Sequence, residues 1–227
     1  MRYMDNITAI ITNGLLKDLH IAERTFYLNR KISLLHSTIP EGYKYDISYI
    51  LYDLSYTEMI LGLSRLYDNL NNRYPTRCLK LLYKEFLVGS NIEKSISEKE
   101  ISLRELGSLE SFPEMRMLLM ERTGDEFKNT LIMYLETLEV NGVLAEAIDK
   151  LKEIRDKFLA HNEDIRIDTL MPYTNLHSLI VHAKEVLAFF SLYCSGIHLT
   201  ANGHFILSQS SLAWGSKYED FINSKSA

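Results

Sequence analysis

Long stretches of this chain pass without a residue that breaks a helix. Its 227 residues include only 10 glycines and 4 prolines. Between these breakers, apolar residues recur at the three- and four-residue spacing of a helix with one apolar face. Apolar residues make up 46% of the chain, enough for a substantial core. The sequence therefore predicts an all-α protein, folded as a bundle of helices.

The breakers and the apolar stripes together set the bounds of six expected helices. These helices cover residues 5–36, 46–69, 76–87, 113–138, 143–161 and 173–196. The helix at 113–138 is expected to be weakened near Gly124. The helix at 46–69 is apolar on more than one side, because Ile47 and Leu54 form a second stripe, so we expect it to be central.

Two segments depart from this regular pattern. Residues 90–112 are rich in serine and glutamate, and we interpret them as a solvated, partly helical excursion from the bundle. Residues 199–227 form a C-terminal tail after a bundle domain at 1–198, and this tail carries a small amphipathic patch of Trp214, Tyr218 and Phe221. The patch either docks onto the chain's own bundle or binds a partner.

Charge and cysteine content restrict where the protein works. The net charge of −5 argues against a broad electrostatic grip on nucleic acid but leaves a local basic cleft open. Cys78 and Cys194 lie far apart in apolar helical contexts, as expected of buried free thiols in a reducing cytoplasm. The apolar stretch 176–199 is interrupted by charged residues, which predicts a buried helix and no membrane span.

One run, residues 154–163 (IRDKFLAHNE), concentrates groups that can act on a phosphodiester. The guanidinium of Arg155 can neutralise charge, and the imidazole of His161 can move a proton. Six residues of straight helix would separate the two along the axis by about 9 Å, so they could not meet directly. A joint site requires the helix to end or unwind near Ala160, or requires a second subunit.

The same residues also allow a plainer account. His161 continues the apolar stripe of its helix and can be a hydrogen-bonded core residue. Arg155 can form a surface salt bridge with Asp156 or Glu153, which contributes little to stability. Spacing alone leaves both accounts open.

The pattern resembles the signature of the HEPN superfamily (higher eukaryotes and prokaryotes nucleotide-binding domains), in which a polar residue follows an arginine and a histidine comes a few residues later. Here these are Arg155, Asp156 and His161, with five residues between arginine and histidine. The wording is similar to the branch related to abortive-infection protein U. A second segment, residues 61–68 (LGLSRLYD), resembles a stretch on the second helix of that branch.

The resemblance implies an up-and-down bundle with extra helices and a C-terminal tail. It implies a homodimer whose two motifs face one cleft, and metal-independent cleavage of RNA without a cofactor. His161 would be the general acid or base, Arg155 would stabilise charge on the phosphoryl group, and Asp156 would orient one of them. Lys157 would add positive potential for RNA, although a solvated helix face explains it equally well.

Arg65 and Asp68 of the second segment have two readings. They are three residues apart on one helix, so a local ion pair is the simple account. The alternative is that Arg65 or Asp68 reaches the later helix near Arg155 and sets its orientation.

Three functions are compatible with these observations. The leading expectation is an endoribonuclease of a prokaryotic toxin or antiphage defence system, with RNA as substrate and an antitoxin as partner. The second is an inactive dimeric module of the same type that binds a partner as a scaffold. The third is a plain helical interaction protein. The histidines and cysteines show no metal-ligand spacing, so no metal site is expected.

Overall fold

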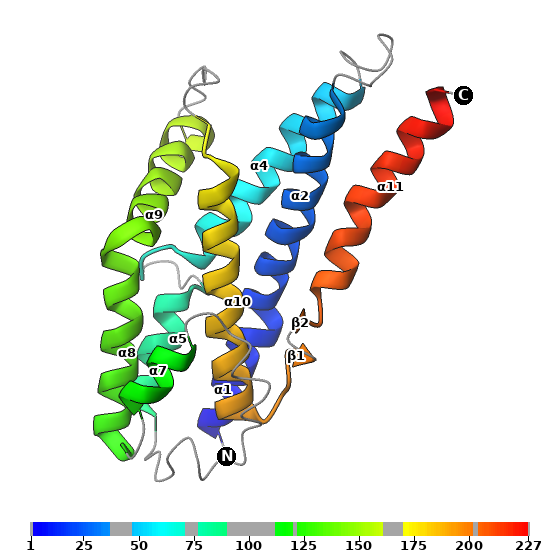
Figure 1. Cartoon of the computed structure of the whole chain (residues 1–227). Helices are drawn as coiled ribbons and strands as arrows, with labels where there is room; N and C mark the ends of the chain where they lie inside the picture. Colours follow the sequence, from blue (N-terminus) through cyan, green and yellow to red (C-terminus); the bar gives the residue numbers. More distant parts are fainter. Residues whose placement is uncertain are drawn as a thin grey trace.

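The computed structural model describes residues 2–36, 47–70, 77–89, 112–119, 122–160, 170–201 and 204–226. In this part of the chain nearly all regular structure is helical, which confirms the predicted all-α class (Figure 1). The expected excursion at 90–112 lies outside the described residues except for Phe112, and His161 lies outside them too.

The first expected helix is a continuous rod made of three pieces. It consists of α1 (Arg2–Ile10), a π-helical turn η1 (Ile11–Leu15) and α2 (Leu16–Leu35). Beside α2 lies α4 (Tyr49–Leu66), and the two approach closely at Gly62. A Cβ atom added at Gly62 would lie 3.0 Å from the carbonyl oxygen of Asp18 and 3.2 Å from the Cβ of Ala22. Glycine at this position therefore lets the two helices pack in contact.

The middle of the chain forms a helical hairpin with two shorter helices beside it. The short helices are α5 (Leu79–Val88) and α7 (Phe112–Leu119), and the hairpin consists of α8 (Gly124–Val140) and α9 (Gly142–Ile154). The prediction of one helix over 113–138 was wrong, because α8 begins afresh at Gly124 with a positive φ of 57°. Thr123 before it is extended, so the α-helix cannot continue through this point.

The central helix is α10 (Tyr173–Ser195), which lies between the α8–α9 hairpin and α2 in Figure 1. It ends at Gly196, whose φ of 65° is the left-handed conformation typical of a helix C-terminus. By length and composition α10 could cross a membrane, but 78% of its most apolar window is buried inside the protein. Burial against the other helices is the role that its sequence predicted.

An aromatic cluster joins α10 to α5 and α8. The ring of Phe190 packs edge-on against Phe86, with centroids 5.0 Å apart. The ring of Tyr193 stacks on Phe127 at the same centroid separation of 5.0 Å. Phe86, Phe127 and Phe190 are fully buried. This cluster holds α5 and α8 in a fixed position relative to the central helix.

The expectation that α4 is central was wrong in one respect. Its buried side faces the core through Tyr56, Met59 and Leu63. The second predicted stripe is on the surface, since Ile47 is 41% exposed and Leu54 is 55% exposed. Periodicity showed two apolar faces, but the neighbouring helices cover only one of them.

The C-terminal segment docks onto the bundle, as one of the two alternatives required. Strands β1 (Thr200–Ala201) and β2 (His204–Phe205) pair antiparallel and lead into α11 (Ser208–Ser226), which packs along α2. Tyr218 of the predicted patch is buried, and its hydroxyl donates to Ser48 Oγ at 2.8 Å. Trp214 stays 43% exposed at the edge of this contact.

Candidate functional site

Regular α-helix stops at Arg155, the first residue of the predicted catalytic pair. Here α9 continues as a π-helical segment, η5 (Arg155–Ala160), whose wider i→i+5 turns change the direction of every following side chain. The sequence required the straight helix to end or unwind near Ala160. The change begins five residues earlier, at Arg155. Short π-helical segments often occur at functional sites.

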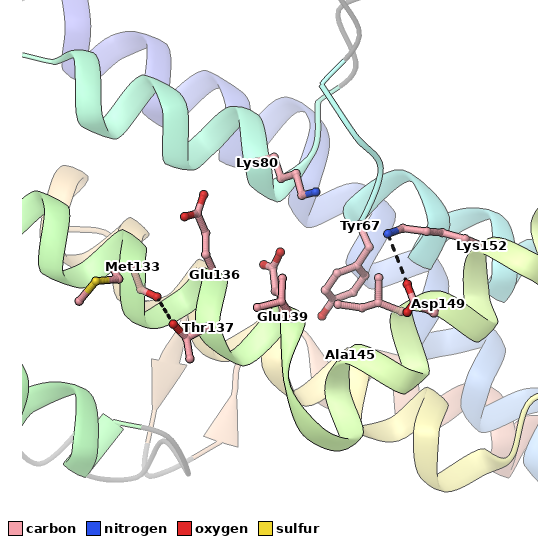
Figure 2. Close-up of a pocket in the computed structure, with 11 residues that line it drawn as sticks. Tyr67, Lys80, Met133, Glu136, Thr137, Glu139, Ala145, Asp149 and Lys152 are labelled. Atoms are coloured by element: carbon pink, nitrogen blue, oxygen red, sulfur yellow. Dashed lines mark hydrogen bonds and ion pairs between the residues drawn. The ribbon is translucent and has the colours of Figure 1, made fainter.

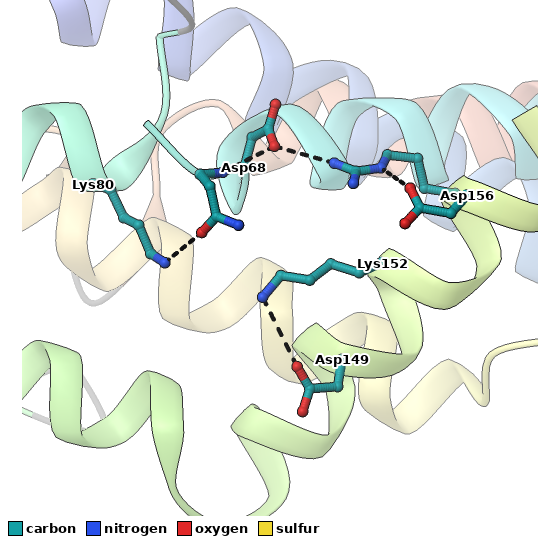
Figure 3. A network of polar contacts seen from close by, with 7 residues as sticks. Asp68, Lys80, Asp149, Lys152 and Asp156 are labelled. Carbon is teal, nitrogen blue, oxygen red and sulfur yellow. Dashed lines mark hydrogen bonds and ion pairs between the residues drawn. The ribbon is translucent and has the colours of Figure 1, made fainter. Parts of the chain in front are cut away.

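The two segments named by the resemblance meet in space. Nη1 of Arg155 donates to Oδ1 of Asp68 at 3.1 Å, although the residues are 87 positions apart in the chain (Figure 3). Asp68 follows directly after Tyr67, where α4 leaves helical geometry. The prediction that Asp68 reaches the later helix near Arg155 is therefore confirmed as a contact. Asp156 holds the same guanidinium from the other side, with Nε of Arg155 donating to its Oδ1 at 2.8 Å.

The guanidinium keeps part of its capacity for a ligand. Arginine carries five N–H donors, and these contacts to Asp68 and Asp156 use two of them. The side chain is 31% exposed, so it is neither buried nor freely solvated. The hydrogen bond to Asp156 contributes most to raising the pKa of Arg155, so the group stays charged. Its remaining donors can bind an anionic oxygen such as that of a phosphoryl group.

Arg65 takes no part in this arrangement. Its Nη1 lies 3.2 Å from Oδ1 of Asp18 on α2, and its side chain is 52% exposed. The simple account of a local Arg65–Asp68 ion pair was wrong, because the two side chains bind partners on different helices. The supporting role predicted for Arg65 has no counterpart in its contacts.

Lys157 lies on the solvated surface of the helix. Its ammonium binds Oε1 of Glu153 at 2.7 Å, and its side chain is 53% exposed. The hydrogen bond from Lys157, together with a second from Lys150, lowers the pKa of Glu153 to about 2. These contacts fit the account of Lys157 as part of a charged helix face better than a role toward RNA.

The sequence did not point to a cavity beside Arg155. It has a volume of about 520 Å³ and lies between α5, the α8–α9 hairpin and the end of α4. Figure 3 shows Lys80 and Lys152 projecting into the space next to Asp68 and Asp156. The lining residues come from separate elements without a common motif. The one available signal was the three-residue spacing of Asp149, Lys152 and Arg155, which places them on neighbouring positions of α9.

A buried histidine lies behind the cavity wall. The hydroxyl of Tyr67 donates to the carbonyl oxygen of Leu179 at 2.7 Å and lies 2.9 Å from Nδ1 of His182. Since the single hydroxyl proton goes to Leu179, Nδ1 must carry the proton that it shares with Tyr67. Nε2 is then an acceptor, and it is buried without a partner among the described residues. Burial lowers the pKa of His182 to about 4.

This shift predicts a loss of stability in mild acid. Between pH 6.5 and about 4 the unfolded chain binds a proton at His182 that the folded chain does not, so the free energy of unfolding falls as pH falls. The full loss would be about 3 kcal/mol, levelling off below pH 4. In the variant His182→Phe, which keeps a ring but cannot titrate, urea unfolding at several pH values should show a flatter profile. Equal slopes in both proteins would contradict this assignment.

Within the described ranges, no group of three or more histidine, cysteine, aspartate or glutamate side chains is arranged to hold a metal ion. Cys78 and Cys194 are buried and not joined in a disulfide. Comparison with protein-family models, with curated proteins and with solved structures gave no match.

Proposed function

We propose that this protein is a metal-independent endoribonuclease of HEPN type, acting in the cytoplasm as a homodimer in a prokaryotic toxin or antiphage defence system. The Asp68–Arg155 ion pair is the observation that carries it. Two segments that were singled out only for their resemblance to this family, 87 residues apart, contact each other directly. A chance resemblance in either segment would not require such a contact.

The arrangement supports a division of roles along one helix end. Arg155 is held from two sides, so its orientation is set before a phosphodiester arrives, and no reorganisation is needed at the moment of reaction. Asp68 and Asp156 act as positioning residues for that guanidinium. His161 follows five residues after Asp156 and would supply the proton transfer, taking a proton from a ribose 2′-hydroxyl or giving one to the leaving 5′-oxygen.

A second candidate is an inactive dimeric module that binds a protein partner, such as an antitoxin-like protein, as a scaffold. The aspartates around Arg155 favour it, since two carboxylates hold the one cation on which phosphate binding depends. The overall charge of −5 points the same way, because RNA binding is supported by positive potential.

The deciding experiment is cleavage of a labelled RNA pool by the purified full chain, with and without EDTA. A His161→Ala preparation purified in parallel reports any contaminating nuclease. Cleavage that survives EDTA, leaves 2′,3′-cyclic phosphate ends and is absent from the variant would establish the activity. If a homodimeric wild-type protein leaves the RNA intact, the scaffold function is favoured.

A further inference from the structure

The cavity beside Arg155 has the chemistry of a binding site for a flat, neutral, hydrogen-bonding group. Its volume of about 520 Å³ lies within the usual range for small-molecule sites, roughly 300–1,000 Å³. The apolar part of its wall includes Val140, Ala145 and Ile148. The ring of the buried Tyr67 closes one end, as Figure 2 shows. Such a lining offers contact to both faces of a planar ring.

Opposite charges stand on opposite walls of the cavity. Glu136 and Glu139 project from α8, whereas Lys80 projects from α5 and Lys152 from α9 (Figure 2). Asp149 lies beside Lys152 at the exposed rim, 3.8 Å from its ammonium. Three carboxylates against two ammonium groups make the cavity a poor place for a phosphate. It suits a neutral ligand that has donors on one edge and acceptors on another.

The acceptor side is best defined at Glu139. Its Oε1 accepts a hydrogen bond from the hydroxyl of Tyr83 at 2.7 Å, which fixes the carboxyl group in place. A carboxylate has about four acceptor positions, so it can still receive two N–H donors from a ligand. Burial raises the pKa of Glu139, as expected for a carboxyl group at the inner wall. Glu139 therefore offers a fixed acceptor inside a pocket that is otherwise open.

The donor side is supplied by Lys80. Its ammonium binds the amide oxygen of Asn69 at 2.7 Å, a neutral partner that orients the side chain and leaves its charge uncompensated. Among the nucleobases, guanine carries a ring N–H beside an amino group on one edge and two acceptors, O6 and N7, on the next. Carboxylates pair with the first edge and lysine or arginine with the second.

The cavity also adjoins the proposed catalytic arginine. Tyr67 lines the cavity and Asp68, the next residue, holds Arg155. Lys152 lines it from α9, one turn before Arg155 on the same helix. A nucleotide whose base lies in the cavity would therefore direct its phosphate toward the guanidinium and away from the carboxylates.

We propose that this cavity binds a guanine base, with Glu139 accepting from its N1–H and amino groups and Lys80 donating to O6 or N7. The bound guanine being part of an RNA strand rests on the proposed ribonuclease, and in that case the cavity would select the base next to the cleaved phosphate. Binding of guanine itself does not depend on cleavage.

The test is calorimetric titration of the full chain with 5′-GMP, 5′-AMP, 5′-UMP and spermidine. GMP is expected to bind at least about tenfold more tightly than AMP or UMP, because one bidentate base contact discriminates by at least that much. Glu139→Gln should abolish the preference, since an amide can still accept from Tyr83 but cannot pair with two N–H donors. Glu146→Gln, an exposed glutamate on α9 outside the cavity, is the matched control and should bind GMP normally.

A second variant, Ala145→Phe, should fill the cavity and weaken binding of every nucleotide. Equal affinity for all three nucleotides, no binding of GMP by a folded protein, or preferential binding of spermidine would each overturn the guanine site. The two proposals fail separately. A protein that binds GMP but cleaves no RNA keeps the site and loses the ribonuclease, whereas cleavage without any preference for guanine has the opposite meaning.

Discussion

Replacement of His161 by alanine should lower the rate of RNA cleavage by about 10²- to 10⁴-fold, the usual contribution of a general acid or base. Replacement of Arg155 by alanine should lower it by about 10²- to 10³-fold, because the charge that develops on the phosphoryl oxygens loses its donor. Both effects are measured as single-turnover rates on one defined RNA in EDTA. His204→Ala, which removes an exposed histidine from β2, is the matched control and should cleave at the wild-type rate.

The loss in Arg155→Ala should come without unfolding. The Asp68–Arg155 pair is about one-third exposed on both sides, so removing it is expected to change the free energy of unfolding by at most about 1 kcal/mol. Asp68→Asn should then give a smaller loss of rate than Arg155→Ala, since it only loosens the guanidinium. An Arg155→Ala protein that melts normally and cleaves within about threefold of wild type would rule out the assigned role.

Replacement of Phe190 by alanine should lower the free energy of unfolding by about 3–5 kcal/mol, the usual effect of removing a large buried aromatic side chain. Phe190 is fully buried on α10, where its ring contacts both Phe86 and Phe189. The cavity left behind would separate α5 from the central helix, because little else can fill the space. The measurement is the midpoint and slope of urea unfolding.

Two further variants make this prediction specific. Met117→Ala removes an apolar side chain that is 76% exposed on α7, and it should change stability by less than about 0.5 kcal/mol. Phe190→Leu keeps most of the buried volume and should fall between the two. If Phe190→Ala and Met117→Ala destabilise the protein equally, the aromatic cluster is not what holds α5 and α8 against α10.

Helix positions were largely predictable because the signals that set them are local. The bounds of α10 and α9 follow from nearby breakers, Gly196 at one end and Asn141–Gly142 at the other. The break at Gly124 was underestimated, since a positive φ there stops the helix where sequence indicated only a weak point. The change from α- to π-helix at Arg155 had no sequence signal, because both conformations accept the same residues.

The candidate site was predictable only in part, and for a different reason. The sequence identified Arg155, Asp156 and Asp68 as a group of interest, and their contacts join them. It could not decide between Asp18 and Asp68 as the partner of Arg65, because helical periodicity gives the side from which a residue projects and not the neighbour on that side.

By itself, the sequence determined an all-α chain with its helix-breaking positions, and it marked two polar segments as chemically distinctive. Only the tertiary structure decided that α10 and not α4 is the central helix, and that α11 packs along α2. It also decided which charges meet, and it created the cavity with Lys80 and Glu139 on facing walls. Helix formation depends on residues three and four apart, whereas packing depends on surfaces that are far apart in the chain.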